Sequence, residues 1–112
     1  MSMVDEQAAF LLDACRLIQL ATDSGFQVTG GELFRTAEQQ KIYVQTGRSQ
    51  TMASNHLRRL AIDLNFIRNG ELVYDMEQLR PLGNFWESLH PKNRWGGFFK
   101  SFKDMPHFER NV

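Results

Sequence analysis

The sequence predicts an α+β fold, with a small antiparallel sheet and helices packed on one face. Apolar and polar residues alternate over 61–68, and the Asn69-Gly70 pair that follows predicts a β-hairpin, because both turn positions need a positive φ. Apolar residues at helical spacing over 5–22 and 76–89 predict a helix on each side of that hairpin. The length of 112 residues fits one compact domain, so we expect 1–112 to form a single domain.

The first half of the chain predicts two helices and one strand. The amphipathic helix over 5–22 ends at the polar Asp23-Ser24-Gly25. A short strand is predicted over 26–29, and a second helix is predicted from Thr36 to near Gly47. Residues 48–55 are polar and without pattern, which predicts a loop.

The single cysteine, Cys15, lies beside the apolar stripe of the first helix. A lone cysteine excludes an intramolecular disulfide. We expect its side chain to be buried or half-buried as a small hydrophobic residue rather than to act as a reactive thiol.

The second half predicts the hairpin, one helix and a last strand. Ile62, Leu64 and Phe66 share one face of the first hairpin strand, which leaves Asp63 on the other face. Residues 71–74 are predicted to return as the partner strand.

In the helix predicted over 76–89, Pro81 is expected to start or kink the element. Met105 is expected to be extended because Pro106 follows it, which predicts a final strand there.

Charge and hydropathy exclude several classes of function. Thirteen basic and thirteen acidic residues cancel, so nothing in the net charge favours a nucleic-acid partner. No apolar run is long enough to insert in a membrane. The first residues lack the features of a secretion signal, because Asp5 and Glu6 occupy the place of its basic region.

Two pairs of residues are candidates for metal chemistry. His56 and Asp63 are seven apart, which places them on opposite faces of a flat strand unless the chain bends between them, near Arg58-Arg59. Asp104 and His107 are three apart around a proline and also need a turn to converge. Taken alone, these spacings do not distinguish metal ligands from solvated side chains.

Four separated blocks of sequence resemble the zinc peptidase family of D-alanyl-D-alanine carboxypeptidases and dipeptidases and of phage L-alanyl-D-glutamate endopeptidases. The family pattern is Ser-x-His, six residues, Asp, and later an acidic residue three before a final His. The upstream segment from Gly31 to Gln39 is also similar to the family's arginine segment. The blocks that carry the resemblance are Ser54-Asn55-His56, Ala61-Ile62-Asp63-Leu64, Trp95-Gly96-Gly97 and Asp104-Met105-Pro106-His107-Phe108-Glu109.

The resemblance implies a Hedgehog/DD-peptidase-like fold and a Zn²⁺ ion held by His56, Asp63 and His107. Three protein ligands leave a fourth position of tetrahedral zinc for water. The resemblance also assigns Asp104 as the catalytic acid/base and Arg35 as the cation that stabilises the oxyanion. Ser54, Trp95 and Gly96 are expected to bind substrate.

The sequence leaves two interpretations open for the bend at Arg59 and two for the role of Glu109. Arg59 stands where the family usually has a glycine, so the bend is made differently or costs strain. Glu109 is either a support for the metal ligands or a solvated strand end.

The resemblance implies a catalytic domain over 1–112 that hydrolyses peptide bonds of peptidoglycan stem peptides, as an endolysin-like L-Ala-D-Glu endopeptidase. Alternatives are a D-Ala-D-Ala carboxypeptidase and an inactive, metal-stabilised virion or binding module. We expect a monomer with no nucleic-acid partner and no membrane insertion. It would be made in the host cytoplasm and act at the cell wall after release, or be carried in the virion.

Overall fold

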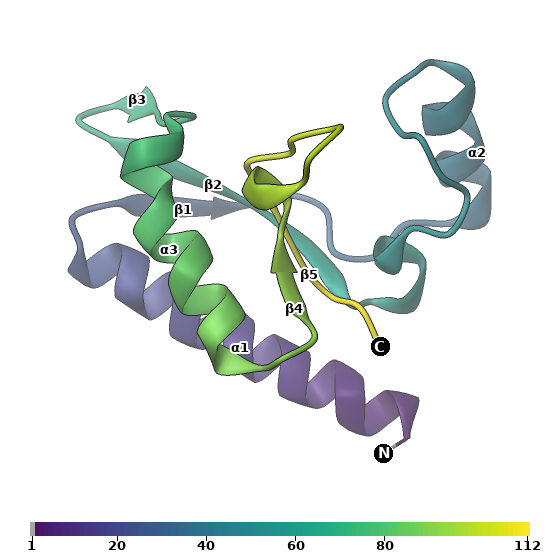
Figure 1. Ribbon diagram of the computed structural model, residues 1–112, viewed down its shortest axis with the longest axis horizontal. Coiled ribbons are helices and arrows are strands. Elements are labelled where there is room, and N and C mark those ends of the chain that lie inside the picture. The colour runs from purple at the N-terminus through teal and green to yellow at the C-terminus, as the bar shows by residue number, and fades with distance from the viewer. Residues whose placement is uncertain (1) are drawn as a thin grey trace.

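The computed structural model describes residues 2–112, and it has the predicted α+β fold (Figure 1). Three α-helices and five strands alternate along the chain, with two short 3₁₀ helices, η1 and η2. In chain order the elements are α1 (Met3–Asp23), β1 (Gln27–Gly30), α2 (Ala37–Gln45), η1 (Asn55–Arg58), β2 (Ala61–Arg68), β3 (Glu71–Leu72), α3 (Met76–Leu89), β4 (Asn93–Trp95), η2 (Gly96–Phe98) and β5 (His107–Arg110).

The sheet is antiparallel throughout, with the strand order β1-β2-β5-β4 and with β3 paired to β2. The pairing of β2 with β5 places Asp63 opposite His107, and Ala61 opposite Glu109. Directly opposed residues of an antiparallel pair project from the same face of the sheet. The register therefore brings Asp63 and His107 together from distant parts of the sequence.

Helices α1 and α3 cover one face of the sheet and pack against each other (Figure 1). Between them and the sheet lies an aromatic core, in which the Trp86 ring meets Phe10 and Phe108 edge to face with centroids 5.4 and 5.8 Å apart. Helix α2 lies apart from these two helices (Figure 1). The packing of helices on one face thus holds for α1 and α3 and not for α2.

A buried polar network fastens α1 to the C-terminal strands. Asp13 Oδ2 accepts hydrogen bonds from Arg110 Nη2 (2.6 Å) and Asn93 Nδ2 (3.1 Å). Arg110 Nε also donates to Asn93 Oδ1 at 3.0 Å. All three residues are buried, so each polar group depends on the others for its hydrogen bonds.

The hairpin has the predicted turn but a shorter second strand. Asn69 and Gly70 both have a positive φ, of 55° and 77°. Strand β3 pairs over Glu71–Leu72 only, after which Val73 N–H donates a last bond to the Phe66 carbonyl.

In the second half of the chain the structure confirms the predicted bounds of one helix, corrects the start of the final strand and adds a strand. Helix α3 begins at Met76, capped by the Asp75 side chain, and continues through Pro81 rather than starting there. The final strand begins at His107, because Met105 and Pro106 form a turn closed by a bond from His107 N–H to the Asp104 carbonyl (3.1 Å). Strand β4 (Asn93–Trp95) was not predicted, since three residues are too few to show an alternation.

The expectation of burial for Cys15 is also wrong. It lies on the outer side of α1 and is exposed, whereas Phe10, Ala14 and Leu17 form the buried stripe. Within residues 2–112 no helix is both long and apolar enough to cross a membrane.

Candidate active site

The first candidate ligand, His56, is placed by a sharp turn between η1 and β2. Ser54 caps η1, its Oγ accepting from His56 N–H at 3.2 Å. Arg59 ends η1 in the left-handed region, at φ 56° and ψ 36°. This is the bend that the odd spacing of His56 and Asp63 requires, and Arg59 adopts there a conformation that favours glycine.

Side-chain atoms of His56, Asp63 and His107 lie within 4.8 Å of one another. Asp63 Oδ1 is 3.4 Å from His56 Nε2 and 3.7 Å from His107 Nδ1. The three predicted metal ligands therefore converge, with two imidazole nitrogens around one carboxylate oxygen.

Hydrogen bonds to the far ring nitrogens leave both near nitrogens free to bind a metal. His56 Nδ1–H donates to the Leu33 carbonyl at 3.1 Å, which places the lone pair on Nε2. This Nε2 is buried and has no hydrogen-bond partner within residues 2–112. An orphaned buried nitrogen is costly unless something binds it, so the donor set fits a divalent cation.

The second histidine is oriented by a buried carboxylate. His107 Nε2–H donates to Glu109 Oε1 at 2.7 Å, and Glu109 Oε2 accepts from Arg94 Nε at 2.7 Å. Glu109 is only 4 % exposed, so it orients the His107 ring and is not a solvated strand end. The sequence did not predict Arg94 as a residue of the site.

The electrostatics of the cluster favour a positive charge between the carboxylates. Burial alone raises the pKa of Asp63, but the two imidazoles beside it outweigh burial and lower this pKa to about 2. Burial lowers the pKa of His107, but its acceptors Asp63 and Glu109 outweigh burial and raise it to about 9. The same carboxylates that hold a proton on His107 attract a metal cation.

Asp104 lies beside the three ligands, with Oδ2 4.0 Å from His107 Nδ1. Burial raises the pKa of Asp104, and the nearby charge of Asp63 raises it further. Gly96 fixes its backbone: the Gly96 carbonyl accepts from Asp104 N–H at 3.0 Å, and a Cβ on Gly96 would lie 2.1 Å from the Asp104 carbonyl oxygen.

Arg35 reaches the same cleft from the segment that precedes α2. Its guanidinium pairs with Glu32, through a 2.6 Å bond from Nε, and Nη1 donates to Gln40 Oε1 at 2.7 Å. Gln40 is fully buried and also donates to Ser49 Oγ, at 2.9 Å, and to the Thr51 carbonyl. Gln40 thus joins Arg35 to the loop before η1, a role that its place in a polar helix did not signal.

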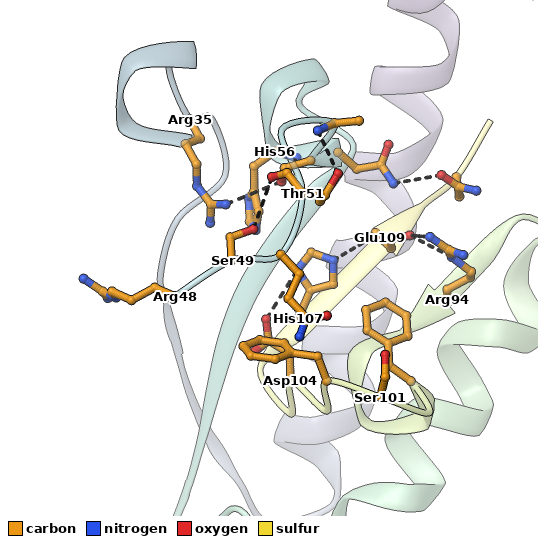
Figure 2. Close-up of a pocket in the computed structure, with 17 residues that line it drawn as sticks. Arg35, Arg48, Ser49, Thr51, His56, Arg94, Ser101, Asp104, His107 and Glu109 are labelled. Atoms are coloured by element: carbon orange, nitrogen blue, oxygen red, sulfur yellow. Dashed lines mark hydrogen bonds and ion pairs between the residues drawn. The ribbon is translucent and has the colours of Figure 1, made fainter. Parts of the chain in front are cut away.

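A cleft opens over these groups, and Figure 2 shows His56, His107, Asp104 and Arg35 around it. Ser54 lines the cleft, half-buried, with its Oγ 3.4 Å from Arg35 Nη1. Trp95 and Gly96, which were expected to bind substrate, are both buried and do not line this cleft. Trp95 packs in the core, where its indole N–H donates to the Met105 carbonyl (2.8 Å).

Comparison with known proteins finds relatives of one kind. The sequence profile of the D-alanyl-D-alanine carboxypeptidase family matches residues 47–110. The L-alanyl-D-glutamate peptidase of Listeria phage A118 is 33% identical over 102 residues, which are 88% of this chain and 35% of that protein. The chain therefore spans about a third of the length of this curated relative.

A solved structure shares the fold. The L-Ala D-Glu endopeptidase ChiX of Serratia marcescens superposes with a TM-score of 0.68 at 27% identity. The match covers 88% of this chain and 78% of ChiX.

Proposed function

Because this chain belongs to the D-alanyl-D-alanine carboxypeptidase family of peptidases, we propose that it is a zinc peptidase that cuts peptidoglycan stem peptides at the L-alanyl-D-glutamate bond. The peptidase relatives from Listeria phage A118 and Serratia marcescens support this choice of bond. We further propose that residues 1–112 act as one catalytic domain and as a monomer, made in the host cytoplasm and acting on the cell wall.

Zinc suits the donor set of this site. Two imidazole nitrogens and one carboxylate are a common catalytic zinc set, and they leave one coordination position open. When bound, zinc lowers the pKa of a bound water and polarises the carbonyl of the bond to be cut. His56, Asp63 and His107 would hold the ion.

Asp104 is suited to proton transfer. It stands beside the ligands in the open cleft, 40% exposed at its side chain, so water and a peptide nitrogen can both approach it. Its raised pKa lies closer to the working pH than that of an ordinary aspartate, which suits a group that takes a proton from the attacking water and passes it to the leaving amine.

Arg35 is suited to stabilising the negative charge that develops on the carbonyl oxygen. Its side chain is held by Glu32 and Gln40 and is only 11% exposed, so the charge is fixed in place before substrate arrives. Ser54 lies next to it and offers a hydroxyl for a substrate hydrogen bond.

The observation that carries this proposal is the buried Nε2 of His56, which has no hydrogen-bond partner among residues 2–112. This nitrogen faces Asp63 and His107 beneath an open cleft. The test is to incubate the purified chain with peptidoglycan and measure new amino termini. Activity should disappear with a chelator and return with zinc. Activity that a chelator does not affect would contradict the proposal.

Mass analysis of the released peptides separates two peptidase activities. A D-Ala-D-Ala carboxypeptidase, which the description of the matching family favours, releases single D-alanine. The proposed endopeptidase leaves stem peptides that begin with glutamate.

An Asp104→Asn variant separates a peptidase from an inactive, metal-stabilised binding module. In a peptidase this variant keeps zinc and the fold but loses about 10²–10⁴-fold in turnover. Unchanged turnover would contradict the role of Asp104.

A further inference from the structure

Three arginines line the cleft, and they differ in how their charge is balanced. Arg35 pairs with Glu32, and Arg94 pairs with Glu109. Arg48 has no carboxylate within ion-pair distance among residues 2–112. It is the one guanidinium of the cleft whose charge no acidic side chain of the described chain balances.

Arg48 is nevertheless held in place. Its backbone N–H donates to the Tyr43 carbonyl at 2.8 Å, directly after the C-terminus of α2. Its guanidinium carbon lies 4.7 Å from the centroid of the Tyr43 ring, and that of Arg35 lies 4.6 Å from the same centroid. Stacking on an aromatic ring orients a guanidinium while leaving its N–H groups free to donate in the ring plane.

The position of Arg48 connects the cleft to the reacting groups. The cleft continues past Arg35, Asp104 and Phe102 into a second hollow on the Asp63 side, which Lys103 and Glu32 also line. Arg48 borders both hollows. Figure 2 shows its side chain at the left edge of the residues that line the cleft, below Arg35. A peptide lying over Asp63 and Asp104 would therefore pass this rim.

We propose that Arg48 is a specificity-determining residue that binds a free carboxylate on the residue next to the cleaved bond. This inference rests on the proposed function. A glutamyl residue within a peptide uses one of its two carboxyl groups to continue the chain, so the other stays free whichever is used. The two glutamates of the cleft, Glu32 and Glu109, are paired with Arg35 and Arg94, and no carboxylate of residues 2–112 pairs with Arg48, so a substrate carboxylate can be its partner.

The test compares two peptides that differ only at that carboxylate: L-Ala-D-Glu-L-Lys and the same peptide with the free carboxylate converted to an amide. Wild type, Arg48→Gln and Lys41→Gln, all zinc-loaded, are assayed for kcat and KM on both. Lys41→Gln is the matched control, because Lys41 is an exposed cation of α2 that lines neither hollow.

Arg48→Gln is expected to raise KM for the acid peptide about 3- to 10-fold, the effect of losing a charge pair at an exposed residue. Its kcat should change little, because this carboxylate takes no part in the reaction and is bound equally in ground and transition states. On the amide peptide Arg48→Gln should match wild type, and Lys41→Gln should match wild type on both.

A second readout does not depend on turnover. The acid peptide, but not the amide peptide, should protect Arg48 of the wild type from phenylglyoxal modification, as followed by peptide mass mapping. Equal losses on acid and amide peptides, or no loss on either, would overturn the role of Arg48 while leaving the proposed function in place. Failure of the wild type to cut either peptide would overturn both proposals.

Discussion

The hydrogen bond between His107 and Glu109 allows a quantitative prediction for metal affinity. Glu109→Gln keeps the length of the side chain and an oxygen that accepts from His107 Nε2–H, but it removes the negative charge. Glu109 is 4 % exposed and its bond to His107 is 2.7 Å long, so the charge acts with little screening by solvent.

The magnitude follows from the change in bond type. A hydrogen bond to a charged group contributes about 1.5–3 kcal/mol, against about 0.5–1.5 kcal/mol for a neutral pair. The difference of about 1–1.5 kcal/mol corresponds to a zinc Kd about tenfold weaker. Arg94 adds little to this loss, because its side chain is half exposed and can turn into solvent when the carboxylate is gone.

The assay is competition for zinc with a chromophoric chelator at fixed pH, with circular dichroism to show that the fold is kept. Glu71→Gln is the matched control. Glu71 is an exposed residue of β3 that pairs with Arg68, at the end of β2 away from the site. A Glu109→Gln variant that binds zinc within a factor of about two of wild type would refute the reasoning, because removing the group that accepts a hydrogen bond from a metal-binding histidine typically weakens metal affinity by about 10- to 100-fold.

Three further predictions concern strain, the buried network and protons. Arg59→Gly should be more stable than Arg59→Ala by about 1 kcal/mol in urea unfolding, because only alanine carries a Cβ at φ 56°; equal stabilities would show that the turn relaxes. Arg110→Ala should lower the free energy of unfolding by about 3–5 kcal/mol because Asp13 loses its buried partner, and a cost under 1 kcal/mol would contradict this. Without metal, the raised pKa of His107 contributes stability that is complete below about pH 6.5 and is lost as the pH rises through about 9. Zinc must displace that proton, so calorimetry at pH 7 in buffers of different ionisation enthalpy should show release of about one proton, and no buffer dependence would contradict the shift.

The sequence predicted the parts of the fold that have a local signal. The alternation over 61–68 predicted strand β2 with the bounds observed, and the Asn69-Gly70 pair predicted the turn that follows it, although the second strand is shorter than predicted. Strand β4 is defined by its partner β5 rather than by any pattern of its own, and the sequence did not predict it. The burial of Cys15 was predicted wrongly, because residues on both sides of the apolar stripe of α1 have similar hydropathy. Only the packing of the helix shows which of them are buried.

For the site, the motif predicted residues that the structure brings together, and the structure adds the residues that hold them in place. His56, Asp63, His107, Asp104 and Arg35 converge as the resemblance implied. Gln40 and Arg94, which support Arg35 and Glu109, were not predicted, because a hydrogen bond between distant segments leaves no trace in the spacing of residues. Trp95 and Gly96 belong to the motif for packing, since Gly96 admits the Asp104 backbone at a distance that a Cβ would block.

The alternation of side chains along β5 explains which residues follow one another at the end of the motif. Side chains of β5 alternate between two faces, so His107 and Glu109 point to the cleft while Phe108 and Arg110 point into the core. Phe108 packs against Trp86, and Arg110 binds Asp13 of α1, so the core-facing residues fix the strand that carries the metal ligand. A shift of register by one residue would exchange these faces and remove His107 from Asp63. The buried network and the proposed metal site therefore depend on the same strand, β5, and loss of Arg110 should weaken zinc binding, measured by competition with a chelator, as well as the fold.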